Sequence, residues 1–260
     1  MTTLVLPPRY TPDSITLSKA ANRKGWDVCR FASWRVPEGF SAEKIVLYGE
    51  PLFASVVVDA LGVVALEPSW DWLPSLPERY RLRKVVRSSL GKARGLAQKL
   101  FVKPLEDKCF AAKVYECGND LPPVSHLPDS TPILISDPVD WRIEFRTFVL
   151  DRQVRTLSPY LRDGELAEDK NGQWPATAEE LEAATIFAKQ VLTDPEVQMP
   201  RAFVLDIGRI EGRGWAVIEA NAAWGAGIYG CDPDEVINVL ESATARTIDL
   251  SDQDKKWVVR

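Results

Sequence analysis

The chain has 260 residues, of which 45% are hydrophobic and 27% charged, and its formal net charge is −5 at pH 7. This length suffices for one large or two small domains with a substantial core. The negative charge, together with the lack of a long lysine and arginine run, argues against a nucleic-acid partner.

The first quarter of the sequence alternates strand and helix patterns. Strands are predicted at 3–8, 27–33, 44–50 and 63–69, and helices at 13–25 and 51–62. Asp13 or Ser14 is expected to cap the first helix, and Gly25 to end it. The alternation predicts a small parallel α/β unit that ends near Ser69 and forms an N-terminal domain over residues 1–75.

A proline- and tryptophan-rich stretch, residues 69–77, predicts the connection to a second domain over residues 76–260. The basic segment 78–94 is expected to form a helix. Longer apolar runs then predict a mostly antiparallel sheet, with strands at 99–106, 111–117, 132–139, 141–151, 153–161, 201–210 and 215–221. The helix expected between the last two strand pairs starts with a capping box formed by Thr177 and Glu180.

Histidine, cysteine and targeting signals are sparse. The one histidine, His126, lies in a proline-rich loop and is expected at the surface, and the four cysteines show no C-x-x-C spacing. These features argue against a zinc site, and against nucleophilic catalysis with a histidine base unless His126 is that base. Without a signal sequence or an apolar run that spans a bilayer, the chain is expected to be cytoplasmic, with reduced thiols and no membrane partner.

The last predicted hairpin carries a candidate metal site. A turn centred on its EGRG segment places Asp206 opposite Glu219, with Asn221 two residues further on the same face. Opposed carboxylates repel each other, whereas two carboxylates and an amide oxygen suit Mg²⁺. An exposed acidic face is the alternative, and the neighbours expected on that face, Val204 and Val217, make full exposure unfavourable.

Strand 141–151 separates a charged face from an apolar one. Arg142, Glu144 and Arg146 alternate with apolar residues, which is typical of a sheet with one wet side. The same stripe suits the wall of a cleft, because the fork of an arginine binds phosphate or carboxylate at two points. Lys103, before a proline at the end of an apolar strand, is either an edge residue or a phosphate ligand.

In their order and spacing these segments resemble the ATP-grasp ligases, from about Arg81 to Asp232. The resemblance of "FVKP" to the family's strand lysine implies that Lys103 contacts the phosphates of ATP and takes part in catalysis. A second lysine is expected from Lys84, with Lys92 as its competitor. "LISDPV" is similar to the hinge whose backbone binds adenine, and it implies adenine contacts at Ser136, Asp137 and Val139.

The rest of the resemblance concerns ribose, metal and substrate. It implies that Glu144 binds the ribose and that Arg146 is a catalytic residue facing phosphate or substrate. The paired strands "VLDIG" and "WAVIEAN" imply that Mg²⁺ is held by Asp206, Glu219 and Asn221. Val204 stands where many members have an arginine, so substrate contacts are expected from Arg155, Tyr160 or Arg209.

The segment "WGAGIYG", residues 224–230, matches the glycine fingerprint of dinucleotide-binding proteins. Such a fingerprint follows the first strand of a βαβ unit, and too few residues follow it here for that unit. We therefore expect a loop beside the metal strand, close to an acceptor substrate.

The resemblance implies an α/β fold in which a small parallel unit precedes a two-lobed ATP-grasp region that binds ATP and Mg²⁺ between its lobes. It implies an ADP-forming ligase that joins a carboxylate to an amine or a thiol through an acylphosphate. The partner is expected to be a small molecule, an amino acid or a peptide that carries a carboxylate. An ATP-dependent phosphotransferase and a non-catalytic nucleotide-binding module are the alternatives.

Overall fold

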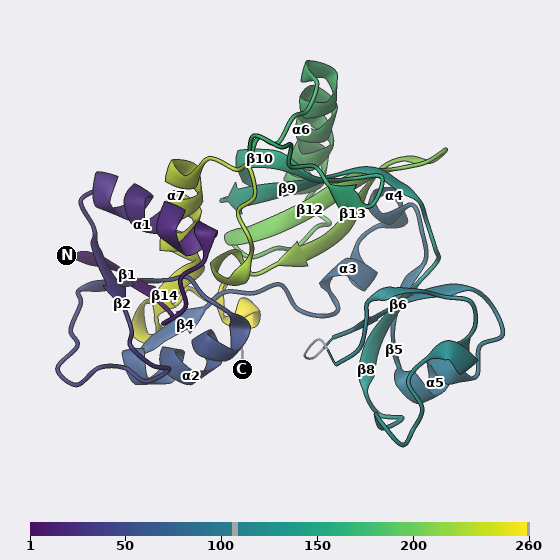
Figure 1. The fold of residues 1–260 in the computed structure, drawn as a ribbon, viewed down its shortest axis with the longest axis horizontal. Coiled ribbons are helices and arrows are strands. Elements are labelled where there is room, and N and C mark those ends of the chain that lie inside the picture. Colours follow the sequence, from purple (N-terminus) through teal and green to yellow (C-terminus); the bar gives the residue numbers. More distant parts are fainter. Residues whose placement is uncertain (106–108, 259–260) are drawn as a thin grey trace.

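The computed structural model describes residues 1–105 and 109–258. Figure 1 shows a small N-terminal part with α1 and α2, a long central sheet beneath α6, and a separate lobe that contains β5, β6 and β8. The predicted α/β class is confirmed, because a parallel sheet in the N-terminal part is combined with two larger antiparallel sheets.

The N-terminal sheet is parallel and has the strand order β2-β1-β3. Its elements are β1 (Thr2–Leu6), α1 (Pro12–Arg23), β2 (Asp27–Arg30), β3 (Lys44–Leu47) and α2 (Pro51–Leu61). The expected cap of α1 is wrong, because Thr11 is the N-cap and its side chain accepts a hydrogen bond from the Ser14 backbone N–H at 3.1 Å. Pro12 has no N–H to satisfy and suits the first helical position, which moves the cap to the residue before it.

The fourth predicted strand has a different partner from the one expected. β4 (Val63–Ala65) does not join the parallel sheet but pairs antiparallel with β14 (Thr244–Arg246). A further bridge between Leu66 and Val258 extends this pairing. The apolar pattern located the strand, whereas its partner lies far along the sequence.

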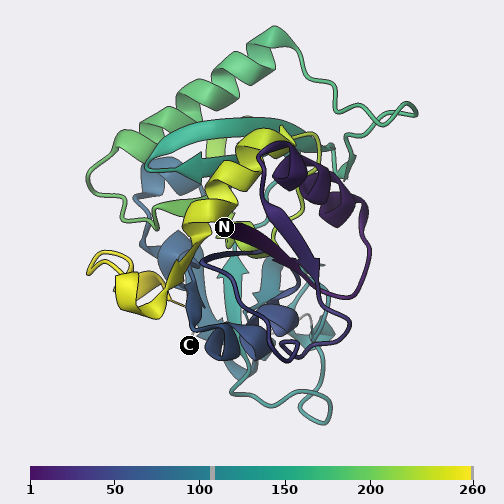
Figure 2. The same cartoon turned by 90° about the vertical axis from the view of Figure 1, so that its left-hand side faces the viewer.

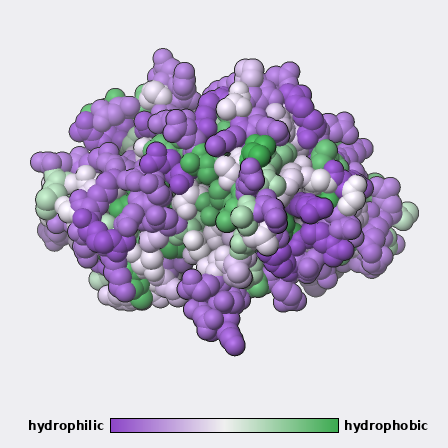
Figure 3. Space-filling view, turned by 90° about the horizontal axis from the view of Figure 1, so that it is seen from above, coloured by the Kyte–Doolittle hydropathy of each residue, from purple (hydrophilic) through white to green (hydrophobic). Residues whose placement is uncertain are grey.

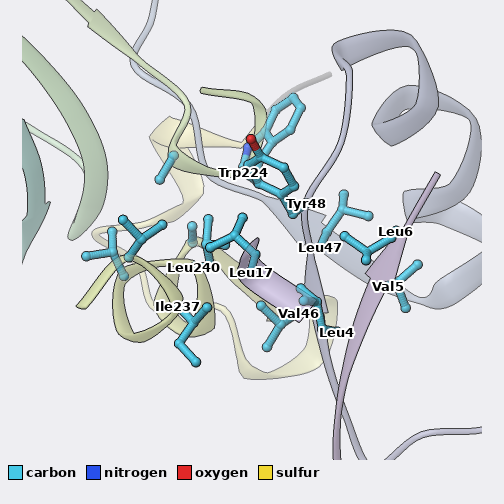
Figure 4. Packing of buried hydrophobic residues seen from close by; sticks show 14 of the residues in the cluster. Leu4, Val5, Leu6, Leu17, Val46, Leu47, Tyr48, Trp224, Ile237 and Leu240 are labelled. Atoms are coloured by element: carbon cyan, nitrogen blue, oxygen red, sulfur yellow. The ribbon is translucent and has the colours of Figure 1, made fainter. Parts of the chain in front are cut away.

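The core of the N-terminal part includes α7 (Pro233–Ala243). Leu17 of α1 and Val46 of β3 belong to the same buried cluster as Ile237 and Leu240 of α7 (Figure 4). Figure 2 shows α7, in yellow, lying against the purple N-terminal elements. The domain boundary at residue 75 stays a prediction.

The basic segment 78–94 is not one helix as expected. It forms α4 (Glu78–Arg81), β5 (Val85–Ser89) and α5 (Leu90–Arg94). Leu82 has φ +49°, a left-handed conformation that ends α4. The β-branched Val85 then pairs with Ser136 of β8, so a long-range strand pairing decides the structure of this segment.

The smaller lobe is a four-stranded antiparallel sheet with the order β5-β8-β6-β7. Its other elements are β6 (Leu100–Pro104), β7 (Lys113–Tyr115), the 3₁₀ helix η1 (Gly118–Asp120) and β8 (Pro132–Ser136). The expected end of a strand at residue 106 lies outside the described residues. His126 is exposed in this lobe, as predicted.

The central sheet is antiparallel and has the order β11-β10-β9-β12-β13. Its elements are β9 (Trp141–Leu150), β10 (Gln153–Arg162), β11 (Glu165–Leu166), α6 (Ala178–Thr193), β12 (Ala202–Ile210) and β13 (Gly214–Asn221). Phe187 of α6 packs with Phe145 on one face, whereas Phe148 and Val204 share the cluster of α7 on the other. The capping box of Thr177 and Glu180 is confirmed.

Short elements complete the chain: α3 (Trp72–Ser75), η2 (Ala223–Gly225), η3 (Thr247–Asp249) and η4 (Lys255–Trp257). None of the helices within the described residues has the length and apolar character needed to cross a membrane. The face of the molecule in Figure 3 is largely hydrophilic, with apolar residues gathered toward its middle.

Candidate functional site

A cavity of about 370 Å³ lies between the smaller lobe and the central sheet. Phe101 of β6 and Leu134 of β8 line it from one side, and Trp141 and Ile218 line it from the central sheet. Its volume is in the range of ordinary small-molecule sites, and its mixture of apolar walls with a few polar groups is typical of them. The polar side chains that line it include Arg83, Lys103, Glu219 and Asn221.

The predicted hinge, Ser136 to Val139, lies along this cavity. Asp137 is fixed by Lys84, since the Asp137 N–H donates to the Lys84 carbonyl at 3.1 Å and the Lys84 N–H donates to Asp137 Oδ2 at 2.9 Å. The backbone N–H of Val139 has no hydrogen bond within the described residues. A backbone donor at the wall of a cavity is available to a bound ligand.

Neither candidate for the second lysine lines the cavity. Lys84 and Lys92 are both exposed, and Arg83 lines the cavity instead. Side chains of an extended segment alternate, so Arg83 shares its side with the cavity-lining Val85 whereas Lys84 points away. This alternation was the signal in the sequence that would have identified Arg83.

Arg83 is buried and held in place by backbone carbonyls. It donates to the carbonyl oxygens of Val217 at 2.7 Å and Ile218 at 3.0 Å, and its guanidinium lies 5.0 Å from the centre of the Trp141 ring. Burial, with a smaller contribution from neighbouring Arg81, lowers the pKa of Arg83 to about 10. Arg83 therefore remains a cation at neutral pH.

The register of the last hairpin is confirmed, since Asp206 pairs with Glu219 and Val204 with Asn221. A bulge follows, because Ile207 pairs with Val217 and leaves Ile218 as the extra residue. The bulge turns Val217 into the cluster beneath α6, so its expected place on the face of Glu219 is wrong.

A chain of charged groups replaces the expected repulsion between the two carboxylates. Asp206 is fully buried and accepts two hydrogen bonds from Arg146, Nε to Oδ1 at 3.0 Å and Nη2 to Oδ2 at 2.7 Å. The side-chain amide of Asn221 donates to Asp206 at 3.0 Å and to Glu219 at 2.9 Å. Glu219 also forms an ion pair with Lys103. Each carboxylate therefore has its own cation.

The two carboxyl groups differ in acidity. Burial raises the pKa of Asp206, and the charge of Arg146 offsets only part of this effect. Burial acts in the same direction on Glu219, but Lys103 and Asn221 outweigh it and hold the pKa of that carboxyl below its usual range. The Lys103 end of the chain thus favours the carboxylate that lines the cavity.

The oxygen donors fit a hard cation that shares its coordination with a ligand. Asp206, Glu219 and Asn221 offer carboxylate and amide oxygens, and no group of three His, Cys, Asp or Glu side chains suited to a metal occurs in the described parts of the chain. Mg²⁺ is usually held by one or two carboxylates together with the phosphates of a substrate. The three residues therefore suit Mg²⁺ bound with a nucleotide, with Asn221 presenting its oxygen.

The charged stripe of β9 is divided between two environments. Glu144 is buried, accepts a hydrogen bond from Tyr160 Oη at 2.7 Å and is not among the residues that line the cavity, so its ribose role stays a prediction. Arg142 is exposed and pairs with Asp163 and Glu211. Only Arg146 reaches the charged groups of the hairpin.

Of the expected substrate contacts, Tyr160 lies near Arg146, whose guanidinium is 5.4 Å from the centre of its ring. Arg155 is engaged with Glu235 at 2.8 Å. Arg209 lines a different hollow beside α6, together with Arg142 and Arg162. The structure thus brings one of the three residues to the site.

A family model described as an ATP-grasp domain, the second family of its clade, matches residues 80–239. The chain belongs to the ATP-grasp superfamily. A search of curated protein sequences found no match.

Solved structures of ATP-grasp proteins share the fold. D-cycloserine synthetase DcsG is 14% identical with a TM-score of 0.58, over 92% of this chain and 98% of that chain. A RimK domain ATP-grasp protein from Sphaerobacter thermophilus DSM 20745 is 11% identical with a TM-score of 0.52, over 93% and 98%. The macrocyclase MdnC, bound with precursor peptide MdnA, from Microcystis aeruginosa MRC, is 11% identical with a TM-score of 0.52, over 91% and 98%.

Proposed function

We propose that this ATP-grasp protein is an ADP-forming ligase that joins a carboxylate to an amine or a thiol, using ATP and Mg²⁺. The observation that carries the proposal is the buried chain Arg146–Asp206–Asn221–Glu219–Lys103 beside a cavity of nucleotide size between two lobes. The amino-acid and peptide chemistry named for its structural neighbours is consistent with such a reaction.

The cavity is assigned to ATP. Adenine lies against the apolar walls and accepts a hydrogen bond from the Val139 N–H, while Lys103 and Arg83 provide positive charge for the phosphates. Asp206, Glu219 and Asn221 hold Mg²⁺, which neutralises the negative charge that develops during phosphoryl transfer. Arg146 orients the carboxylate of the substrate, because its fork binds a carboxylate at two points.

The reaction follows in two steps. A carboxylate oxygen of the substrate attacks the γ-phosphorus, so that an acylphosphate forms while the bond to the β-phosphate breaks and ADP leaves. The amine or thiol then attacks the acyl carbon and inorganic phosphate leaves. Catalysis of the first step rests on charge neutralisation and positioning, which carboxylates, lysines and arginines supply without a histidine.

Hydroxylamine tests this proposal because it captures an acylphosphate as a hydroxamate. Wild-type protein with Mg²⁺, ATP and a panel of carboxylic acids is expected to yield hydroxamate and ADP in equal amounts with the accepted acid. Phosphorylation of a hydroxyl compound, with no hydroxamate from any acid, would make the protein a phosphotransferase. Nucleotide binding without any turnover would make it a binding module.

Arg146→Lys is the variant that tests the site, and Arg142→Lys on the same strand is its control. Arg146→Lys keeps the charge but loses the fork, so turnover is expected to fall by about a hundredfold while ATP affinity changes little. Arg142→Lys, whose side chain is exposed, is expected to keep turnover. Equal losses in both variants would remove Arg146 from the reaction.

A further inference from the structure

The glycine loop that follows β13 carries a point where an anion, a cation and an aromatic ring meet. A Cβ placed on Gly227 would lie 3.5 Å from Asp13 Oδ2, 3.7 Å from Arg146 Nη1 and 3.7 Å from Tyr229 Cε2. Gly227, Tyr229 and Asp13 are all partly exposed, so a small ligand can reach this point. Groups of both signs therefore flank one small space.

The carboxylate of Asp13 has no structural role that explains its position. Thr11 caps α1, so the cap does not need Asp13. Its Oδ2 accepts hydrogen bonds from Tyr48 Oη at 3.1 Å and from the Ile228 N–H at 3.1 Å, which hold it against the loop. Within residues 1–105 and 109–258 it forms no ion pair with a lysine or an arginine. Its negative charge is therefore available to a ligand.

Arg146 faces the same point with donors to spare. A guanidinium has five N–H groups, and Arg146 uses three of them, two for Asp206 and one for the Gly227 carbonyl at 3.0 Å. The remaining two have no partner among the described residues. The rings of Tyr229 and Tyr160 lie 4.9 and 5.4 Å from the guanidinium and enclose it.

We propose that the acid activated by this protein is a free α-amino acid, whose carboxylate binds Arg146 and whose ammonium group binds Asp13. This inference rests on the proposed ligase function and names its substrate class. In an α-amino acid one carbon separates the ammonium from the carboxylate, which matches two opposite charges that flank a single space. A carboxylate within a peptide has no such ammonium beside it and leaves Asp13 unpaired.

Two glycines of the loop provide a matched pair of variants. The contacts of a Cβ on Gly227 are at ordinary van der Waals distances, so Gly227→Ala is expected to fold, and its methyl group fills the proposed ligand space. A Cβ on Gly225 would meet only the Gly49 carbonyl oxygen, at 3.5 Å, away from that space. Gly225→Ala therefore controls for a general effect on the loop.

The test is calorimetric titration of the protein with L- and D-α-amino acids, each compared with its N-acetyl derivative, in the presence of Mg²⁺ and a non-hydrolysable ATP analogue. Wild-type protein is expected to bind at least one amino acid about tenfold or more tightly than the N-acetyl derivative. Asp13→Asn, which keeps the shape but not the charge, is expected to bring this ratio close to one. Gly227→Ala is expected to abolish amino-acid binding, and Gly225→Ala to preserve it.

Separate outcomes overturn the inference and the proposed function. A wild-type protein that binds the nucleotide but prefers N-acetyl acids or peptides, or binds no free amino acid, overturns the inference alone. Equal losses for both ligand forms in Asp13→Asn give Asp13 a structural role and also overturn it. Failure to bind the nucleotide overturns the proposed function itself.

Discussion

Two arginines four residues apart on β9 meet opposite environments. Arg146 is 7% exposed and bound to the fully buried Asp206, whereas Arg142 is exposed and shared between Asp163 and Glu211. Both point to the same side of the strand by alternation, and both form ion pairs of ordinary geometry. Only the buried pair lies next to oxygen donors that suit a metal.

The difference shows that the neighbours of an ion pair decide its worth. An exposed pair is screened by water and contributes little to stability, while a buried pair holds charges that cannot be left alone. The buried end of the stripe therefore concentrates charge for chemistry, and the exposed end contributes mainly to solvation. Three pairs of variants separate the two roles.

The largest expected effect is on folding. Arg146→Ala leaves Asp206 buried without its cation, so the free energy of unfolding is expected to fall by about 3–5 kcal/mol. Arg142→Ala removes an exposed partner and is expected to change it far less. Urea denaturation measures both variants, and similar losses would erase the contrast between the two arginines.

The second effect concerns ATP. Lys103→Ala removes a proposed phosphate contact, so ATP affinity is expected to fall about tenfold to a hundredfold, or about 1.5–3 kcal/mol, while adenosine affinity changes little. Lys99, which pairs with Glu116 at the surface, provides the control, because Lys99→Ala is expected to affect neither ligand. Calorimetric titration with ATP and adenosine distinguishes a lost phosphate contact from damage to the lobe, which would weaken both.

The smallest effect concerns the metal. In wild-type protein, Mg²⁺ with ATP is expected to raise the melting temperature by about 2–4 °C more than ATP alone, equivalent to about 1 kcal/mol. Glu219→Gln is expected to lose this increment, while Glu211→Gln, at the exposed end of the stripe, keeps it. Because Lys103 already neutralises Glu219, the variant is not expected to gain stability without ligand. A full Mg²⁺ response in Glu219→Gln would remove it from the metal site.

Local patterns in the sequence were sufficient where neighbouring residues decide the structure. The two-residue period of the strands and the position of the turn fixed the pairing of Asp206 with Glu219. The capping box of α6 likewise lies within a single turn, between Thr177 and Glu180. The family resemblance then connected the segments into a fold.

Patterns failed where distant residues decide. Residues 78–94 have the charge pattern of a helix, but β8 takes Val85 into a sheet. Burial selects Arg83 for the cavity over the more conspicuous Lys84, and a bulge at Ile218 shifts Val217 to the other face. None of these outcomes is written in the few residues around it, because each depends on which surface another part of the chain presents.

The pairing of β4 with β14 has a consequence for biosynthesis. β4 leaves the ribosome early, while its partner at Thr244–Arg246 exists only after residues 66–243 have been made. At about 5–20 residues per second, this apolar strand waits on the order of ten seconds or more with its edge unpaired. Unpaired strand edges attract other strands. Nascent chains on one messenger are thus open to association with each other for as long as β14 is missing, and a chaperone that covers β4 during this interval would shorten their exposure.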